Sequence, residues 1–326
     1  MDGMPTGLPA YGGVAWMDGA YVPADQARIS VFDFGFTRSD VTYDVVHVWN
    51  GAFFRLDHHL DRFLASVATL RMTLPVDRAG LHDILAGCVA RSGLRDAYVA
   101  MVCTRGRPPP GSRDLRQCRN QLIAYALPFI WLSDPAAQGR GMSAILGAFP
   151  RIPPESVDPR VKNYHWLDLD RSLLEAYDRG ADTAILLDAD GNVTEGPGFN
   201  VFAVIGDTVV TPDRGVLEGI SRQTVIDICR EQGMKLEVRS LGRAEFLDAD
   251  EIFATSTAGG VMPVVRIENR ILGNGAPGPV SQKLRTLYWG RHDDPRERTE
   301  VDYGEAPADA ADAYARQREL IPGGGR

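Results

Sequence analysis

The stretch from Ser156 to Val204 constrains the fold most, because it combines an unusual lysine, a helix and several strands in a fixed order. Lys162 comes after a break rich in Pro and Asp, and the following DLDRSLLEAYDRG predicts a helix that ends at Gly180. Residues 181–213 then alternate short apolar runs with Asp-Gly and Gly-Asp turns, which predicts four strands. The apolar residues at helical spacing in the helix are Leu169, Leu173, Leu174 and Tyr177.

Lys162 is a candidate for amine chemistry. The chain has only three lysines among its 35 Lys and Arg residues, so arginine supplies positive charge almost everywhere. Arginine cannot lose its proton in a protein, so it cannot act as an amine nucleophile. Lys235 and Lys283 lie in ordinary amphipathic segments, whereas Lys162 precedes the aromatic cluster Tyr164-His165-Trp166. Schiff-base formation with a carbonyl cofactor is the leading interpretation, and a surface lysine at a helix start is the alternative.

Glu195 is predicted to end the second of these strands, just before Gly196-Pro197-Gly198. Its neighbours in the strand are apolar, and a carboxylate in such a place must have a partner or lie at the mouth of a site. A protonated pyridine nitrogen would be such a partner.

Two further segments suit an anion. GISRQTVIDICREQG predicts a helix with Ser221 as its N-cap and Gly233 at its end, and the start of a helix presents unpaired N–H groups. DEIFATSTAGG places hydroxyls and glycines at a strand end, where backbone can surround a phosphate. Each signal is weak alone, because most helices begin with such a cap and bind nothing. Together they are stronger.

The N-terminal half predicts a hairpin on Asp18-Gly19 and a strand over VTYDVVHVW, with Tyr43, Val45 and His47 on one face. Asp57 is predicted to cap the next helix, and Arg62 falls outside its apolar stripe, as an exposed surface arginine would. The loop RGRPPPGSRDLR, starting at Arg105, is long and stiffened by prolines, which is typical of functional loops.

Composition excludes several classes. The net charge is −8 with a pI near 5.3, which argues against nucleic acid or an anionic membrane as partner. We expect no signal peptide, no membrane helix and no metal site, because neither an apolar run of sufficient length nor a metal-binding spacing occurs. The cysteines fit reduced thiols, so a cytoplasmic protein is expected.

The motifs DPRVKNYHWLDL, TEGPGFNVF, GVLEGISRQTV and TSTAGGVMP, in this order, resemble the class IV (fold type IV) pyridoxal-phosphate aminotransferases. Within that family the chain is most similar to the (R)-selective amine transaminases, through GGVAWMDGAYVPADQARISVFD and SDVTYDVVHVWNGAFFRLDHHLDRF. The resemblance extends over roughly residues 9 to 303.

This resemblance implies a two-domain α+β fold with pyridoxal 5'-phosphate between the domains. We expect a small domain over residues 1–130, a linker over 131–140, a large domain over 141–305 and a polar tail over 306–326. A homodimer is also implied, with the proline-rich loop at the edge of a substrate pocket.

The resemblance also assigns roles. Lys162 would hold the cofactor as a Schiff base and then move the proton, and Glu195 would keep the pyridine nitrogen protonated. The other cofactor-binding residues implied are Arg62, Leu217, Ile220, Ser221, Ser256 and Thr257. The substrate-binding residues implied are Arg38, Tyr43, Val45, His47, Tyr98, Trp166, Thr257 and Ala258.

The predicted activity moves an amino group from an (R)-amine or D-amino acid to a keto acid such as pyruvate, in a ping-pong scheme. Alternatives are a D-amino-acid or branched-chain aminotransferase, an aminodeoxychorismate lyase-like enzyme, or a non-catalytic binding protein; joint retention of Lys162, Glu195 and Arg62 argues against the last. Leu167 stands where branched-chain enzymes carry tyrosine, which weakens that alternative, and Arg38 stands where the amine transaminases carry histidine. Arg38 is expected either to bind a substrate carboxylate or to pair with Asp40 or Asp33.

Overall fold

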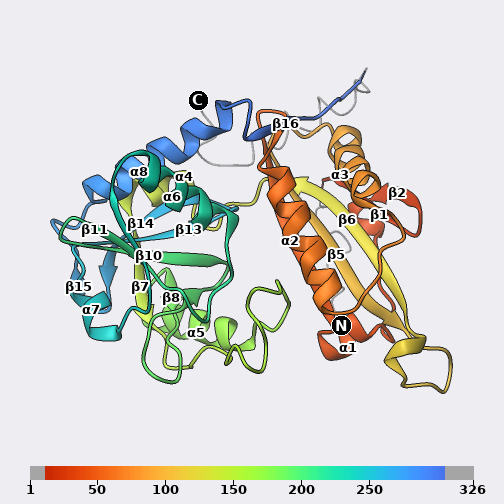
Figure 1. The fold of residues 1–326 in the computed structure, drawn as a ribbon, viewed down its shortest axis with the longest axis horizontal. Coiled ribbons are helices and arrows are strands. Elements are labelled where there is room, and N and C mark those ends of the chain that lie inside the picture. Colours follow the sequence, from red (N-terminus) through yellow and green to blue (C-terminus); the bar gives the residue numbers. More distant parts are fainter. Residues whose placement is uncertain (1–11, 305–326) are drawn as a thin grey trace, which may run out of the picture. The chain divides into compact units, whose positions relative to one another are not determined.

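The computed structural model describes residues 12–304 and divides into two compact units. The first contains the described residues up to Ile130 together with those from Arg298, and the second runs from Trp131 to Glu297 (Figure 1). The predicted polar tail, residues 306–326, lies outside the described residues.

In the described part of the first unit, an antiparallel sheet has the order β16-β4-β3-β5-β6-β1-β2. Its hairpin turns at Asp18, whose φ of 51° is the left-handed conformation such turns need, so the predicted hairpin is confirmed. The strands are β1 (Val14–Met17), β2 (Ala20–Pro23), β3 (Val41–Trp49), β4 (Ala52–Phe54), β5 (Ala97–Arg107), β6 (Arg119–Pro128) and β16 (Arg298–Glu300).

Helices α2 (Leu56–Thr69) and α3 (Arg78–Ser92) run along one face of this sheet (Figure 1). Their apolar side chains form a core with the strand residues that face them, including Val46 and Val48 of β3. Helix α3 has Asp77 as its N-cap and Gly93, with a left-handed backbone, as its C-cap. The remaining short helices are α1 (Phe34–Arg38), η1 (Ala24–Gln26) and η2 (Leu115–Gln117).

The prediction that Asp57 caps α2 is wrong. The N-cap is Arg55, whose left-handed backbone (φ 53°) turns the chain from β4 directly into the helix. Because no extended residue stands in front of the helix, a carboxylate has no place from which to cap it. Asp57 lies instead in the first turn, where it is exposed and pairs with Arg78.

The second unit contains a mixed sheet with the order β12-β11-β10-β13-β14-β7-β8 among its described residues, with β9 on β10 and β15 on β14. Its parallel pairs are β11 with β12, β14 with β7 and β7 with β8. The strands are β7 (Met142–Leu146), β8 (Thr183–Ile185), β9 (Glu195–Gly196), β10 (Phe199–Ile205), β11 (Thr208–Thr211), β12 (Lys235–Val238), β13 (Glu251–Ser256), β14 (Gly260–Ile267) and β15 (Arg270–Ile271). The helices are α4 (Pro135–Arg140), α5 (Leu167–Asp178), α6 (Ile220–Glu231), α7 (Arg243–Asp248), α8 (Pro279–Gly290) and η3 (Arg291–Asp293).

These two sheets with their helices confirm the α+β class. The segment predicted as a linker contains α4, and the N–H of Leu132 in it donates to Ala258 O at 2.7 Å, so it lies with the second unit. At the other end, β16 pairs with β4 and therefore joins the first unit, although the sequence predicts one domain over 141–305.

Two helix details differ from prediction. On α5, Leu174 and Tyr177 are exposed, and the buried face carries Asp168, Leu169, Ser172 and Ala176. The small residues face inward because the helix lies close to the end of β7: a Cβ on Gly147 would come within 2.6 Å of Ser172 Oγ.

On α6 the N-cap is Gly219, and Ser221 lies inside the first turn. The prediction that Ser221 caps this helix is therefore wrong. A side chain on Gly219 would approach Asn200 Oδ1 to 2.0 Å, so the cap position requires glycine. Gly233 follows the helix end with a φ of 64°, as expected for a helix stop.

Among the described residues, no helix is both long enough and apolar enough to cross a membrane. All four cysteines lie in the described part of the chain as free thiols. Burial raises the pKa of Cys88 and Cys103 to about 12, so these thiols are protonated at neutral pH and unreactive.

Candidate active site

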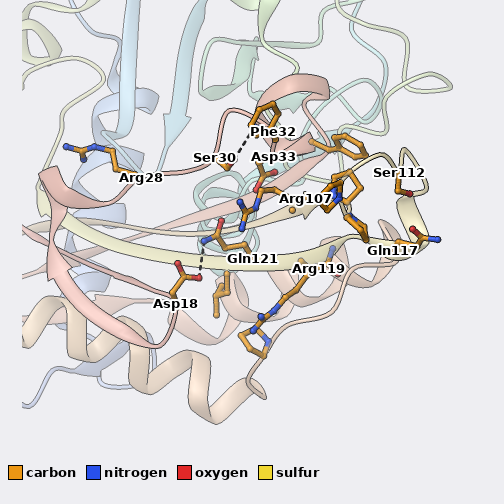
Figure 2. Close-up of a pocket in the computed structure, with 18 of the residues that line it drawn as sticks. Asp18, Arg28, Ser30, Phe32, Asp33, Arg107, Ser112, Gln117, Arg119 and Gln121 are labelled. Carbon is orange, nitrogen blue, oxygen red and sulfur yellow. Dashed lines mark hydrogen bonds between the residues drawn. The ribbon is translucent and has the colours of Figure 1, made fainter.

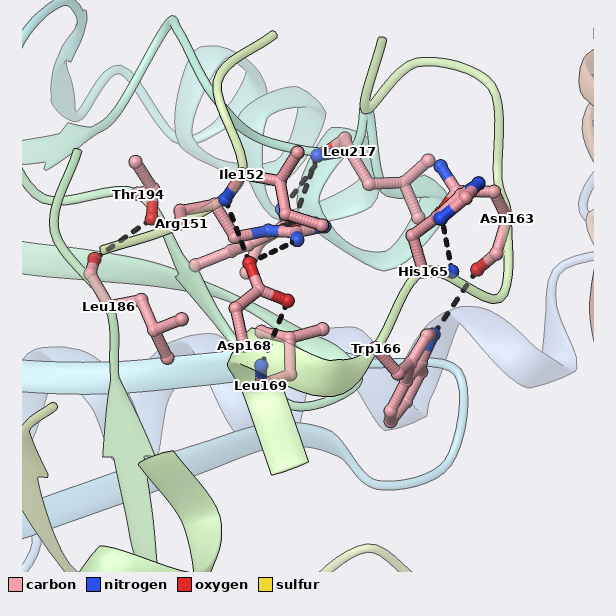
Figure 3. Close-up of polar contacts among 12 residues, drawn as sticks. Arg151, Ile152, Asn163, His165, Trp166, Asp168, Leu169, Leu186, Thr194 and Leu217 are labelled. Atoms are coloured by element: carbon pink, nitrogen blue, oxygen red, sulfur yellow. Dashed lines mark hydrogen bonds and ion pairs between the residues drawn. The ribbon is translucent and has the colours of Figure 1, made fainter. Parts of the chain in front are cut away.

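Lys162 lies in the segment that leads into α5, and this segment is fixed by local hydrogen bonds. Asn163 Oδ1 accepts the N–H of His165 at 3.0 Å, and Trp166 Nε1 donates to Asn163 O at 3.2 Å (Figure 3). Lys162 is half-buried and precedes the helix start at Leu167 by several residues, so it is not a surface lysine of the helix.

Glu195 is buried on β9, where it pairs with Asn200 of β10. Its carboxylate accepts the N–H of Leu217 at 2.8 Å and faces Arg151 Nε at 3.2 Å. Burial raises the pKa of Glu195, and Arg151, the Leu217 N–H and the charge of Lys162 act against that rise. Lys162 and Glu195 are therefore electrostatically coupled, as expected of two residues in one site.

Arg151 is a site residue that no sequence motif marks. Its guanidinium is buried and joins two carboxylates: Nε faces Glu195, and Nη1 donates to Asp168 Oδ2 at 2.7 Å (Figure 3). Asp168 also accepts the N–H of Ile152 at 2.8 Å, which fixes the loop that carries Arg151. The only sequence signal was indirect, namely that a carboxylate among apolar neighbours needs a partner.

The loop before α6 brings Leu217 to Glu195. Leu217 O accepts both the N–H of Gly219 at 2.8 Å and Asn200 Nδ2 at 2.9 Å, so the loop is held on two sides. Helix α6 then begins at Ile220 without any side-chain cap, and its first N–H groups have no partner within the helix. Ser221 in this first turn is buried, and its hydroxyl lies 2.9 Å from Tyr288 Oη.

The turn between β13 and β14 holds the predicted Ser256, Thr257 and Ala258. The Ser256 hydroxyl donates to Gly198 O at 2.8 Å and accepts the N–H of Ala258 at 3.1 Å, so it ties this turn to the loop after Glu195. Thr257 and Ala258 are half-buried.

In the first unit, Arg62 is bound to Asp44 through two hydrogen bonds, Nε to Oδ2 at 2.7 Å and Nη2 to Oδ1 at 2.8 Å. Asp44 is fully buried on β3, and its Oδ1 also lies 2.8 Å from His59 Nδ1. Burial favours a neutral Asp44, but Arg62 and His59 outweigh it and hold the pKa of Asp44 well below its usual range. The Arg62 side chain is only 13% exposed, so the alternative of a surface arginine is wrong.

The opposite face of β3 carries Tyr43, Val45 and His47, as the period of two predicts. Tyr98 on β5 is the cross-strand neighbour of His47, and burial raises its pKa, so its phenol stays protonated. His47 stacks on Phe54, with ring centroids 5.5 Å apart. The face is therefore mostly apolar, with a few hydroxyl groups.

Arg38 ends α1, is exposed, and places its guanidinium 3.5 Å from the centroid of the Phe34 ring. Asp40 pairs with Arg105 at 2.8 Å. Asp33 caps α1 and accepts the hydroxyl of Thr104. The predicted alternative, pairing of Arg38 with Asp40 or Asp33, is therefore wrong, and a carboxylate-binding role stays a prediction.

An open cavity of the first unit lies beside the loop that follows β5 (Figure 2). The proline-rich part of this loop, Pro108–Pro110, lines the cavity, as do Phe32 and Phe34. The loop thus borders a cavity, but its role in substrate binding stays a prediction.

The residues of the second unit fit a pyridoxal phosphate. A primary amine, a buried carboxylate coupled to it, and a helix start with unpaired N–H groups are the groups that bind its carbonyl, its ring nitrogen and its phosphate. The predicted residues thus form two sets: Arg38, Tyr43, Val45, His47, Arg62 and Tyr98 in the first unit, and the remainder in the second.

Comparison with known proteins identifies the family of the chain. The profile of the family described as "Amino-transferase class IV" matches residues 42–267. The chain is 31% identical to the putative branched-chain-amino-acid aminotransferase of Methanocaldococcus jannaschii over 84% of this chain and 94% of that protein. It is 29% identical to the D-alanine aminotransferase of Bacillus licheniformis over 82% and 93%. A solved branched-chain amino acid aminotransferase from "T.th.", in complex with N-(5'-phosphopyridoxyl)-L-glutamate, superposes with a TM-score of 0.82 at 30% identity, covering 89% of this chain and 99% of that one.

The chain belongs to the class IV aminotransferases. It is an enzyme that transfers amino groups with pyridoxal 5'-phosphate, as the family and the phosphopyridoxyl complex of the solved relative show. The predicted fold type, enzyme class and cofactor are therefore confirmed.

Proposed function

We propose that this enzyme moves an amino group from an (R)-amine or a D-amino acid to a keto acid such as pyruvate, in two half-reactions of a ping-pong scheme. The observation that supports the chemistry is the buried set of Glu195, Arg151 and Asp168 coupled to Lys162. It combines an amine with a buried carboxylate whose charged form Arg151 favours against the effect of burial.

Each residue has a definite task in this proposal. Pyridoxal phosphate, when bound, supplies an electron sink for the negative charge that develops on the substrate carbon. Lys162 binds the cofactor and moves the substrate proton, and Glu195 holds a proton on the pyridine nitrogen. The start of α6 and the turn at Ser256 bind the phosphate, together with Arg62. Leu217 and Ile220 line the cofactor.

The substrate class is supported by the face of β3. Tyr43, Val45 and Tyr98 offer apolar surface and hydroxyl groups, and burial raises the pKa of Tyr98, which suits an alkyl or aryl group. Thr257 and Ala258 add only neutral donors for a carboxylate. The similarity to a D-alanine aminotransferase supports the D-amino-acid part of the proposal.

A branched-chain amino-acid aminotransferase is the second candidate, favoured by the names of several relatives. Leu167 argues against it: the resembled branched-chain enzymes carry tyrosine there, whereas this leucine is 78% exposed. A lyase of the aminodeoxychorismate type is the third candidate.

A donor screen decides among the three. We expect amino transfer from D-alanine to 2-oxoglutarate and from (R)-1-phenylethylamine to pyruvate, with D-glutamate and D-alanine as the respective products by chiral chromatography. Exclusive transfer from L-leucine, L-isoleucine and L-valine would instead establish the branched-chain candidate. Pyruvate release from aminodeoxychorismate without any keto acceptor would establish the lyase.

The role of Lys162 has its own test. Borohydride treatment of the yellow holoenzyme should attach the cofactor to the peptide of Lys162 and to neither Lys235 nor Lys283, by mass spectrometry. A colourless protein that takes up no added cofactor would contradict the proposal.

We further propose that the active form is a homodimer. The segment before and within α1 exposes several large apolar side chains next to the cavity of Figure 2, more than a monomer usually leaves in water. They are Ile29, Val31, Phe32 and Phe36. Light scattering at assay concentration should give twice the chain mass, and Phe32→Asp should shift it toward the monomer with loss of activity. A fully active monomer would refute this.

A further inference from the structure

Tyr288 occupies an unusual place behind the predicted phosphate site. It is fully buried near the end of α8, and its Oη lies 2.9 Å from Ser221 Oγ in the first turn of α6. Its ring also fills the space over Gly260, where an added Cβ would come within 2.9 Å of Tyr288 Cε1. One side chain thus touches both segments predicted to surround the phosphate.

The position of Tyr288 is fixed from the far end of its helix. Glu251, the first residue of β13, accepts the N–H groups of Val280 at 2.9 Å and Ser281 at 2.8 Å at the start of α8. β13 therefore anchors α8 at one end and carries Ser256 at its other end. The helix that carries Tyr288 is therefore anchored to β13, the same strand that ends at Ser256.

The hydrogen-bond inventory of Ser221 gives the contact a direction. A serine hydroxyl has one proton to donate and can accept two hydrogen bonds. Inside a helix that proton commonly goes to the carbonyl four residues back. Here that carbonyl is Leu217 O, and it already accepts two donors, the N–H of Gly219 and Asn200 Nδ2.

We propose that Tyr288 is a positioning residue for the cofactor phosphate, because its phenol donates to Ser221 Oγ and so directs the Ser221 proton toward the phosphate. The inference rests on the proposed assignment of Ser221 to the phosphate. The reverse polarity, with Ser221 donating to Tyr288, would turn the only proton of Ser221 away from the anion.

The experiment measures the dissociation constants of pyridoxal phosphate and of pyridoxal, which lacks the phosphate, by absorbance titration of the cofactor-free full-length protein. Tyr288→Phe removes only the hydroxyl. It should weaken pyridoxal phosphate by about 3- to 10-fold, the size of one net hydrogen bond, and leave pyridoxal within about twofold. Ser281→Ala removes a buried hydroxyl from the same helix, where it donates to Gly278 O, and should change neither constant.

A double-mutant cycle with Ser221→Ala completes the test. If Tyr288 acts through Ser221, Tyr288→Phe should have no further effect in the Ser221→Ala background. Additive losses in the cycle, or equal weakening of pyridoxal and pyridoxal phosphate, would overturn the inference. If Ser221→Ala weakens the phosphate form but Tyr288→Phe does not, only the role of Tyr288 fails. If Ser221→Ala itself has no effect, the assignment of Ser221 fails, and the role of Tyr288 fails with it.

Discussion

Replacement of Arg151 by methionine should move the acid limb of the pH–rate profile to higher pH. Arg151 Nε lies 3.2 Å from Glu195 Oε1, and both side chains are less than one-tenth exposed, so solvent screens the pair little. At an effective permittivity of about 20, two unit charges about 4 Å apart interact by about 4 kcal/mol, which equals about three pKa units. The Leu217 N–H remains as a partner of Glu195, so we expect a shift of about one to three units.

The direction in which the acid limb moves follows from the pKa of Glu195, which burial raises and Arg151 lowers. Without Arg151 the carboxyl becomes protonated at higher pH, and a neutral Glu195 cannot hold a proton on the pyridine nitrogen. The rate should therefore fall first on the acid side and recover as the pH rises. The assay is kcat from pH 5 to 10 with saturating donor, since kcat reports groups in the substrate complex.

Two variants serve as controls. Arg151→Lys keeps the positive charge but not the guanidinium that contacts both carboxylates. The acid limb of this variant should therefore move less than that of Arg151→Met. Asp168→Asn removes the competing carboxylate on the other side of Arg151 and should move the limb slightly the opposite way. Loss of one partner of a buried pair can cost about 3–5 kcal/mol of stability, so circular dichroism must first show that each variant is folded. A profile for Arg151→Met that superimposes on the parent profile would refute the reasoning.

Three other perturbations have defined outcomes. Glu195→Gln should retain the cofactor's absorption band but lose several kcal/mol of transition-state stabilisation, because an amide cannot hold the nitrogen protonated; near-normal kcat would make Glu195 structural. Arg38→Ala should raise KM for pyruvate and D-alanine and spare (R)-1-phenylethylamine; equal effects on both substrate classes, or none, would exclude a carboxylate ligand. Asp44→Asn should lower the free energy of unfolding at pH 7 by about 3–5 kcal/mol, because Arg62 loses its buried partner. That difference should shrink as the pH falls through the low pKa of Asp44, and an unfolding difference that is independent of pH would contradict the ion-pair argument.

The elements that the sequence predicts well are those fixed by local chemistry. The hairpin at Asp18, the alternation along β3 and the stop of α6 before Gly233 each depend on a few adjacent residues. The N-cap of α6 is glycine because Asn200 of β10 leaves no room for a side chain at position 219, and this contact between distant residues leaves no local signal in the sequence. The buried face of α5 likewise depends on how closely that helix lies against β7.

For the candidate site, the sequence shows which groups must be charged but not what holds them. Glu195 stands out because its neighbours are apolar, yet its partner Arg151 lies 44 residues away in a loop without any pattern. Asp44, the partner of Arg62, is a second case of this kind. It alternates with the apolar residues of β3, and only the fold brings Arg62 of α2 next to it. Partners that are distant in sequence leave no periodic signal.

Arg62 and Glu195 illustrate one physical solution applied to opposite charges. Each carries a charge that burial disfavours, and each is held by a buried group of the opposite sign, Asp44 in one unit and Arg151 in the other. The balance differs between them. The pKa of Asp44 is lowered, so its pair stabilises the fold at neutral pH and weakens only in acid. The pKa of Glu195 is raised. Its contribution to the free energy of unfolding is therefore complete below the ordinary glutamate pKa and is lost as the pH rises through the higher pKa of the folded state. Glu195 therefore costs stability at neutral pH, which is the behaviour expected of a carboxylate kept for a cationic ring nitrogen rather than for the fold.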